Sequence, residues 1–278
     1  MTHIIADTLA CIPVEKAKNL GLAYLPQIVI FGNDSFKDDS EIDTATFIKK
    51  LKHASELPKT AAPNPLLYTP ILDKLTKSNE SIIIICPSSK MSGTWRSAET
   101  ARNDYPQADI RVIDTLLVGA GLGTVVLEAV EMAKKNIHAD KIQAAVIEKA
   151  SQNRTYFLVD TLEFLFKGGR IGAAKALIGG LMQIKPLLTI QDGQVAPVDS
   201  QRTHKKAMES LINRIISECP KSLNAHLTIQ YGENLKIAEE LVETLKIRIG
   251  IGKIPITLLP PAIMVHGGPG VLGVSFFV

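Results

Sequence analysis

Hydroxyl side chains gather in one short segment of the chain, from Pro87 to Thr94. This segment follows an apolar run at residues 81–86 and precedes an expected helix at residues 94–103. A helix N-terminus presents unpaired N–H groups and the positive end of the helix dipole, so it binds carboxylates and phosphates. Plain capping of the helix by Ser92 explains the pattern equally well. The candidate anion-binding residues are Ser88, Ser89, Ser92, Gly93 and Thr94.

Known catalytic loop motifs do not fit this segment. It has neither the G-x-x-x-x-G-K-[ST] pattern of a phosphate-binding loop nor the G-x-S-x-G pattern of a nucleophile elbow. The glycines at 119, 121 and 123 have the spacing G-x-G-x-G, which differs from that of a dinucleotide site, and we expect them to allow close packing of a helix. We therefore predict no catalytic residue and no cofactor.

Four further residues are candidates because of their positions at expected turns and helix starts. Thr60 precedes Pro63, where a helix cap is the favoured interpretation. Arg170 follows two glycines that end a helix, and Arg202 precedes an expected helix at 204–218, where a cation opposes the dipole and favours a nearby anion. Solvent exposure, or pairing with local acids such as Glu163 and Asp199, is the alternative for both arginines. His266 precedes a glycine-rich turn and is equally consistent with a structural role and with anion binding.

The composition excludes several classes of function. The formal net charge is only +3 and no basic stripe with interleaved aromatic residues occurs, which argues against a nucleic-acid-binding protein. The 3 cysteines are isolated and the 6 histidines are dispersed, so we predict neither a disulfide framework nor a metal site. Isolated cysteines favour a reducing compartment.

No membrane-inserted or exported segment is expected. No run of about 18 apolar residues occurs, and residues 1–7 are typical of a first strand rather than of a signal peptide. We therefore expect a cytoplasmic protein with no stable membrane insertion.

The first half of the chain alternates strands and helices, which predicts an α/β fold with a parallel sheet. The expected strands are residues 3–6, 25–31, 81–86 and 110–113. One expected helix begins at Pro13. The other expected helices are residues 44–55, 66–77, 94–103 and 118–135, with a loop at residues 59–65.

The second half has a different pattern, so we predict two α/β domains, residues 1–152 and residues 153–278. A turn at Asp192-Gly193 predicts a hairpin of residues 187–190 and 194–198. The expected helices are residues 162–167, 173–182, 204–218 and 235–247. The other expected strands are residues 156–159, 225–230, 256–259 and 274–278, the last of them after a glycine-rich loop at residues 267–273.

Eight pieces distributed along the whole chain resemble, in order and spacing, the DegV family of bacterial lipid-binding proteins. They are Ala6-Asp7-Thr8, Thr60-Ala-Ala-Pro63, Ser88–Thr94, Asp114 with Gly119–Gly123, Thr161–Phe164 with Lys167–Ile171, Ile184–Pro186 with Asp192-Gly193, Arg202-Thr203 with Lys206-Ala207, and His266–Gly270.

The resemblance implies two α/β domains with a long-chain fatty acid held between them. It implies that the acyl chain enters a tunnel in the C-terminal domain, and that Thr60 and Ser92 bind the carboxylate with His266 close by. Some members of the family present the fatty acid to a separate ATP-dependent kinase, which makes an acyl phosphate. Arg170 and Arg202 resemble the basic residues near the head group and the kinase-facing surface.

The chain departs from the family pattern at two places. Ala61, Ala62 and Asn64 replace polar residues after Thr60, and Lys90 stands where glycine is usual. Two alternatives to a fatty acid carrier remain open: a stand-alone small-molecule kinase or phosphotransferase, and a lipid-sensing regulator. The absence of a phosphate-loop signature argues against the first alternative.

Overall fold

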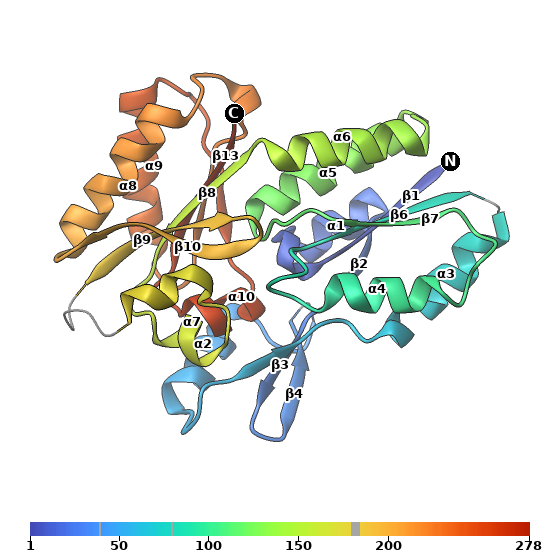
Figure 1. Ribbon diagram of the computed structural model, residues 1–278, viewed down its shortest axis with the longest axis horizontal. Helices are drawn as coiled ribbons and strands as arrows, with labels where there is room; N and C mark the ends of the chain where they lie inside the picture. The colour runs from blue at the N-terminus through green and yellow to red at the C-terminus, as the bar shows by residue number, and fades with distance from the viewer. Residues whose placement is uncertain (39, 79, 179–183) are drawn as a thin grey trace. The chain divides into compact units, whose positions relative to one another are not determined.

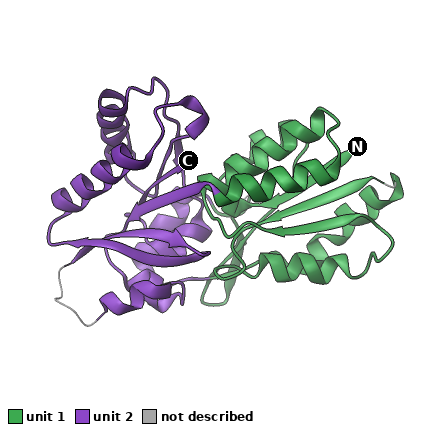
Figure 2. Cartoon of the chain, turned by 45° about the horizontal axis from the view of Figure 1, so that its top comes forward, with its two compact units in different colours: residues 1–42, 60–151 green, residues 43–59, 152–278 purple. Residues whose placement is uncertain are grey.

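The computed structural model describes residues 1–38, 40–78, 80–178 and 184–278 (Figure 1). The chain divides into two compact units, which Figure 2 shows in different colours. Unit 1 comprises residues 1–42 and 60–151, and unit 2 comprises residues 43–59 and 152–278. Strands and helices are mixed in both units, so the predicted α/β class is confirmed.

The segment 43–59 groups with unit 2, whereas the predicted boundary leaves it in the first domain. It carries helix α2, Thr44–His53, which Asp43 caps by accepting a hydrogen bond from the backbone N–H of Thr46. Lys52 forms an ion pair with Glu233 at 2.6 Å, and the hydroxyl of Thr44 donates to the carbonyl of Leu259. These contacts join α2 to residues about 200 positions later, which local sequence patterns do not reveal.

Unit 1 is built on a parallel sheet in the order β2-β1-β6-β7. The chain moves from β1 to β2 on one side and later returns to place β6 on the other side. The carboxyl ends of β1 and β6 therefore flank a topological switch point, where open α/β sheets bind their ligands. The bounds are Thr2–Asp7 for β1, Ala23–Leu25 for β2, Ser81–Cys86 for β6 and Ile110–Asp114 for β7.

Helices cover both faces of this sheet (Figure 1). The side chains of Ile82 and Ile84 pack with α3 and α4, and since strand residues alternate, Ile83 and Ile85 face the opposite side, where α5 and α6 lie. All four isoleucines are completely buried, as expected for a strand covered on both faces. The helices of unit 1 are α1 (Val14–Leu20), α3 (Thr69–Leu75), α4 (Thr94–Arg102), α5 (Ala120–Lys134) and α6 (Ala139–Ser151). Three 3₁₀ turns accompany them: η1 (Thr8–Ala10), η2 (Pro65–Leu67) and η3 (Thr76–Ser78).

A second, three-stranded sheet in the order β4-β3-β5 corrects two predictions. The expected strand 25–31 is divided between β2 and β3, because the backbone N–H of Gln27 donates to Thr8 Oγ1 and Asp38 Oδ1 instead of to a neighbouring strand. The expected loop at 59–65 begins with a strand. The bounds are Ile28–Phe31 for β3, Asp34–Lys37 for β4 and Lys59–Ala61 for β5.

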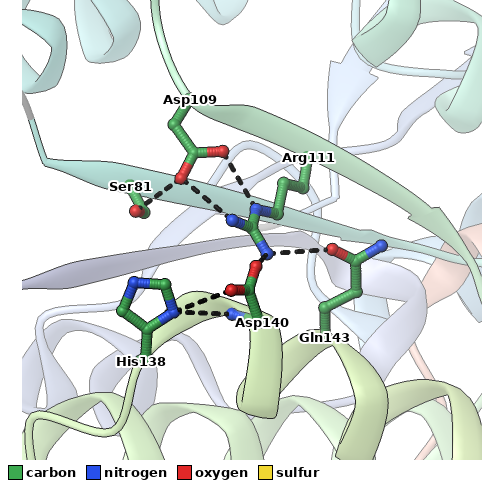
Figure 3. Close-up of polar contacts among 6 residues, drawn as sticks. All are labelled: Ser81, Asp109, Arg111, His138, Asp140 and Gln143. Atoms are coloured by element: carbon green, nitrogen blue, oxygen red, sulfur yellow. Dashed lines mark hydrogen bonds and ion pairs between the residues drawn. The ribbon is translucent and has the colours of Figure 1, made fainter.

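Helix α6, which the sequence analysis missed, is attached to the sheet by a polar cluster at the amino ends of β6 and β7 (Figure 3). Arg111 donates to Asp109 at 2.9 Å and to Asp140, in the first turn of α6, at 2.5 Å. Ser81 donates to Asp109 at 2.6 Å, and His138 lies 3.1 Å from Asp140. Because this cluster lies at the opposite end of the strands from the switch point, we interpret it as structural.

Unit 2 contains a six-stranded sheet in the order β10-β9-β8-β13-β11-β12. All neighbouring pairs are antiparallel except β11 and β12. Helices α8 (His204–Glu218) and α9 (Leu235–Ile249) pack on this sheet through a core that includes Leu211, Leu245 and Phe276. The bounds are Asn153–Leu158 for β8, Lys185–Gln191 for β9, Gln194–Gln201 for β10, Thr228–Tyr231 for β11, Ile256–Leu258 for β12 and Leu272–Phe277 for β13.

The predicted hairpin is confirmed, with positive φ angles of 48° at Asp192 and 76° at Gly193, as its two-residue turn requires. The expected helix 173–182 is instead a 3₁₀ segment, η4, over Gly172–Leu177, and residues 179–182 of that prediction lie outside the described residues. The remaining helical elements are α7 (Glu163–Lys167), η5 (Leu223–Ala225) and α10 (Pro261–Gly267), the last of which was not predicted.

Candidate functional site

The serine-rich loop after β6 is held in a defined conformation at the switch point of unit 1. The backbone N–H of Ser88 donates to Leu117 at 2.8 Å, and that of Ser92 donates to the carbonyl of Ser88 at 2.9 Å. The backbone N–H of Ser89 donates to the carboxylate of Asp114. Ser88 is completely buried and Ser89 is exposed, so the two neighbouring hydroxyls lie in different environments.

Ser92 does not occupy the N-cap position of helix α4, although its hydroxyl accepts from the first backbone N–H of that helix. Gly93 occupies the N-cap position, and no side chain there accepts a hydrogen bond. The hydroxyl of Ser92 instead lies 3.0 Å from that of Thr94 and accepts from the backbone N–H of Thr94 at 3.3 Å. The side chain of Ser92 is partly exposed, whereas that of Thr94 is buried. Ser92 is therefore the accessible member of this pair.

Asp7, the last residue of β1, lies next to this pair and was not among the predicted site residues. Its Oδ2 accepts hydrogen bonds from Thr94 Oγ1 and from Gln27 Nε2, both at 2.6 Å. Its Oδ1 accepts from the backbone N–H of Leu9. Burial raises the pKa of Asp7 to about 6, and the hydrogen bonds from Thr94, Gln27 and Leu9 oppose this shift. The sequence signals for Asp7 were its place directly after an expected strand and its occurrence in Ala6-Asp7-Thr8, one of the pieces that resemble the family.

Thr60 lies in the middle of strand β5 and is partly exposed. The sequence pattern favoured a helix cap at Thr60, and the structure shows that Thr60 does not cap a helix. Asn64 caps the following turn η2, because its side chain accepts from the backbone N–H of Leu66.

The segment that carries Thr60 lies beside the segment that carries Ser92. A Cβ atom added to Gly93 would stand 3.4 Å from that of Ala62, and the hydroxyl of Ser97 donates to the carbonyl of Pro63. The structure thus brings two predicted segments of unit 1 together. The substituted positions Ala61, Ala62 and Asn64 line an open groove of about 600 Å³ in this unit, together with Lys37 and Arg96.

In unit 2, His266 and Arg170 are near each other. His266 lies in the last turn of α10, before the glycine-rich turn as the sequence predicts. A Cβ atom on Gly168 would clash with its ring, so glycine is required at that position. Burial, together with the charge of Arg170, lowers the pKa of His266 to about 4. The Nη1 of Arg170 donates to the carbonyl of Gly168 at 2.7 Å.

Arg202 is exposed in the bend between β10 and α8. Glu163 and Asp199, which the sequence analysis names as possible ion-pair partners of the arginines, bind other residues. Glu163 pairs with Lys167, and Asp199 accepts from Ser210 and Gln201. Within the described residues, Arg202 forms no hydrogen bond or ion pair. Its side chain is exposed.

Among the described residues, no group of three or more His, Cys, Asp or Glu side chains has the geometry to hold a metal ion. Across the same residues, no helix is both long enough and apolar enough to span a bilayer. Cys11, Cys86 and Cys219 carry free thiols.

Comparison with known proteins gives matches over the whole chain. The family model described as an uncharacterised protein of the DegV family matches residues 1–278. A DegV domain-containing protein from Halalkalibacterium halodurans is 30% identical over 276 residues, which cover 99% of this chain and 98% of that protein.

Two solved structures share the fold. One is a DegV family protein from Thermus thermophilus, described as fatty acid binding, with a TM-score of 0.90, 26% identity and 99% coverage of both chains. The other is DegV from Bacillus subtilis, described as a fatty acid binding protein, with a TM-score of 0.88, 26% identity, and coverage of 100% of this chain and 99% of that one.

Proposed function

The chain belongs to the DegV family, and from this premise we propose that it binds a long-chain fatty acid. The observation that carries the proposal is the similarity over almost the full length of both chains to the fatty-acid-binding protein of Thermus thermophilus. The site geometry supports the same ligand class, since partly exposed hydroxyls lie at the switch point of a parallel sheet without a phosphate-loop motif.

In this proposal, the hydroxyls of Thr60 and Ser92 bind the carboxylate, and His266 contributes a further hydrogen bond. Hydrogen bonds from neutral donors to a charged oxygen are stronger than those between neutral groups. The backbone of the Ser88–Thr94 loop, including Ser89 and Gly93, holds Ser92 in position. The pKa of His266 lies near 4, so its ring is neutral at pH 7 and supplies a single N–H.

Affinity in this proposal comes from the acyl chain and orientation from the head group. Burying a methylene group contributes about 0.8 kcal/mol, so roughly 14 of them contribute about 11 kcal/mol before the costs of association.

We also propose that the chain is a cytoplasmic binding protein rather than a complete enzyme, and that a separate ATP-dependent kinase phosphorylates the bound carboxylate. The exposed guanidinium of Arg202 supports a contact with such a partner, because arginine pairs well with phosphate and carboxylate oxygens. Arg170, which interacts with His266, is assigned to the head group.

Extraction of purified protein with organic solvent, followed by mass spectrometry, tests the ligand class. We expect close to one fatty acid per chain. A bound nucleotide in place of a fatty acid would favour the phosphotransferase alternative. Delipidated protein that ignores added fatty acid in a titration would contradict the proposal.

The roles of the arginines are tested with Arg170→Ala and Arg202→Ala, each assayed for lipid retention and for acyl-phosphate formation with a fatty acid kinase and ATP. We expect both variants to retain lipid and both to lose most of the turnover. Lys205→Ala, which removes another exposed cation near Arg202, is the matched control and should keep wild-type turnover. Wild-type rates in both arginine variants would refute the assignment.

A further inference from the structure

Ser92, Thr94 and Asp7 form a continuous hydrogen-bonded chain that leads from the surface to the interior of unit 1. Thr94 Oγ1 lies 3.0 Å from Ser92 Oγ and 2.6 Å from Asp7 Oδ2. Asp7 is 1% exposed and Thr94 is 2% exposed. Ser92 is therefore the one member of the chain that a ligand in solution can reach.

When Asp7 is ionised, the number of available protons fixes the direction of the hydrogen bonds between Ser92, Thr94 and Asp7. A carboxylate only accepts hydrogen bonds, so the single hydroxyl proton of Thr94 is donated to Asp7. The contact between Ser92 and Thr94 must then use the proton of Ser92. In this state the hydroxyl of Ser92 points inward and its oxygen accepts from the backbone N–H of Thr94, so Ser92 has no proton left to donate to a carboxylate.

Protonation of Asp7 reverses the direction of these hydrogen bonds. The carboxyl O–H of Asp7 then donates to Thr94 Oγ1, and Thr94 donates its own proton to Ser92 Oγ. The proton of Ser92 is released from the contact with Thr94 and can be donated to a bound carboxylate. A single proton on a buried residue thus converts Ser92 from an acceptor into a donor.

We propose that Asp7 is a positioning residue whose proton sets the direction of the Asp7–Thr94–Ser92 chain, so that binding of a carboxylate to Ser92 is coupled to uptake of one proton by Asp7. This inference rests on the proposed function, because it assigns the bound carboxylate to Ser92. It adds a specific group that regulates the same site.

The surroundings of Asp7 allow this titration near neutral pH. Burial raises the pKa of Asp7 to about 6. Burial also raises the pKa values of the thiols and phenols around it, so these groups stay neutral between pH 5.5 and 7.5 and do not compensate its charge. They are Cys11, Tyr24, Tyr68 and Cys86. Asp38 is separated from Asp7 by Gln27, which donates to both carboxyl groups.

The test measures the affinity of delipidated protein for tetradecanoate by titration calorimetry at pH 5.5 and pH 7.5, in the wild type and in Asp7→Asn. Asparagine does not titrate, so the direction of its contact with Thr94 is the same at both pH values. Both affinities are compared between pH 5.5 and pH 7.5. Linkage predicts that the decrease in affinity with rising pH is about tenfold larger for the wild type than for Asp7→Asn. Comparison of the two proteins cancels the titration of the fatty acid itself.

Two further variants keep the test decisive if Asp7→Asn folds poorly. Thr94→Val interrupts the hydrogen bonds between Asp7 and Ser92, so its affinity should depend on pH as weakly as that of Asp7→Asn. Asp38→Asn alters a neighbouring buried carboxyl that is bonded to Thr8 and not to Thr94, and it should keep the wild-type profile. Identical pH profiles in the wild type, Asp7→Asn and Thr94→Val would overturn the inference while leaving fatty acid binding intact. A wild-type protein that binds no tetradecanoate at either pH would overturn the proposed function as well.

Discussion

Two neighbouring serines in the same loop allow the role of a single hydroxyl to be measured. Ser92 is partly exposed and hydrogen-bonded to Thr94, whereas Ser89 is exposed and is fixed through its backbone N–H. We expect Ser92→Ala to weaken tetradecanoate binding by about 1–3 kcal/mol, the value of a hydrogen bond to a charged group. Ser89→Ala is the control and should bind as the wild type does. Equal affinities in all three proteins, measured by calorimetry, would remove Ser92 from the head-group site.

His266 gives a prediction for the effect of pH on stability. Its pKa is lowered to about 4 by burial and by Arg170, so the unfolded chain binds a proton more readily than the folded protein does between pH 6.5 and 4. The stability that His266 contributes is therefore fully present above pH 6.5 and is lost as the pH falls towards 4. We expect the free energy of unfolding of His266→Gln to decrease less over this interval than that of the wild type.

Urea denaturation at a series of pH values measures this difference. His204→Gln, which changes an exposed histidine at the start of α8, should follow the wild-type profile. If His266→Gln also followed it, the pKa of the buried ring would have to lie close to its ordinary value.

At the residue scale, sequence patterns found the loop but not the network behind it. Ser88–Thr94 was identified because a strand, a run of hydroxyl residues and a helix follow one another in sequence. Asp7 and Gln27 were missed because they meet Thr94 only through the tertiary fold, across 87 and 67 positions. The position of Asp7 at the end of a strand suggested no partner, and the direction of its hydrogen bonds is a property of the assembled sheet.

At the scale of the elements, Gly123 in the first turn of α5 sets the distance between that helix and η1. A Cβ atom on Gly123 would clash with the backbone carbonyl of Ala10. Relief of this clash requires α5 or η1 to shift, so we expect Gly123→Ala to lower the free energy of unfolding by about 1–3 kcal/mol despite the higher helix propensity of alanine.

Gly252→Ala is the matched control for this prediction, because a Cβ atom there meets nothing within 4 Å. Its stability should stay within about 0.5 kcal/mol of that of the wild type, as for other surface changes. Thermal unfolding of the two variants checks both expectations. Equal stability of Gly123→Ala and Gly252→Ala would show that α5 can shift away from η1 at little cost.

Long periodic elements were predictable, whereas short ones that depend on tertiary contacts were not. Helix α8 and strand β6 have the bounds that their apolar patterns predict, because each buries a regular face. The break between β2 and β3 depends on side chains of Thr8 and Asp38, which bind the backbone of Gln27. Likewise, α6 is attached by Arg111 and Asp140, residues 29 positions apart.

At the scale of the whole molecule, the two units differ in the kind of sheet that they contain. The sheet of unit 1 is parallel and covered by helices on both faces, and it ends at a switch point lined with hydroxyls. The sheet of unit 2 is mainly antiparallel and carries His266 and Arg170 outside it, near α7 and α10. The chain crosses between the units at residues 42–43, 59–60 and 151–152.

A ligand that binds only the folded state stabilises it by mass action, by about 2.7 kcal/mol when its free concentration is 100 times the dissociation constant. We therefore expect the melting temperature of delipidated protein to rise with the concentration of tetradecanoate. The methyl ester of the same chain length buries a similar apolar area but lacks the charge that Ser92 and Thr60 are proposed to bind, so it should raise the melting temperature less at equal concentration. The Ser92→Ala variant should reduce the difference between the two ligands, because it removes a donor that only the carboxylate uses fully. Equal shifts for acid and ester in the wild type would mean that the apolar chain alone determines binding, and that the hydroxyls at the switch point serve another ligand.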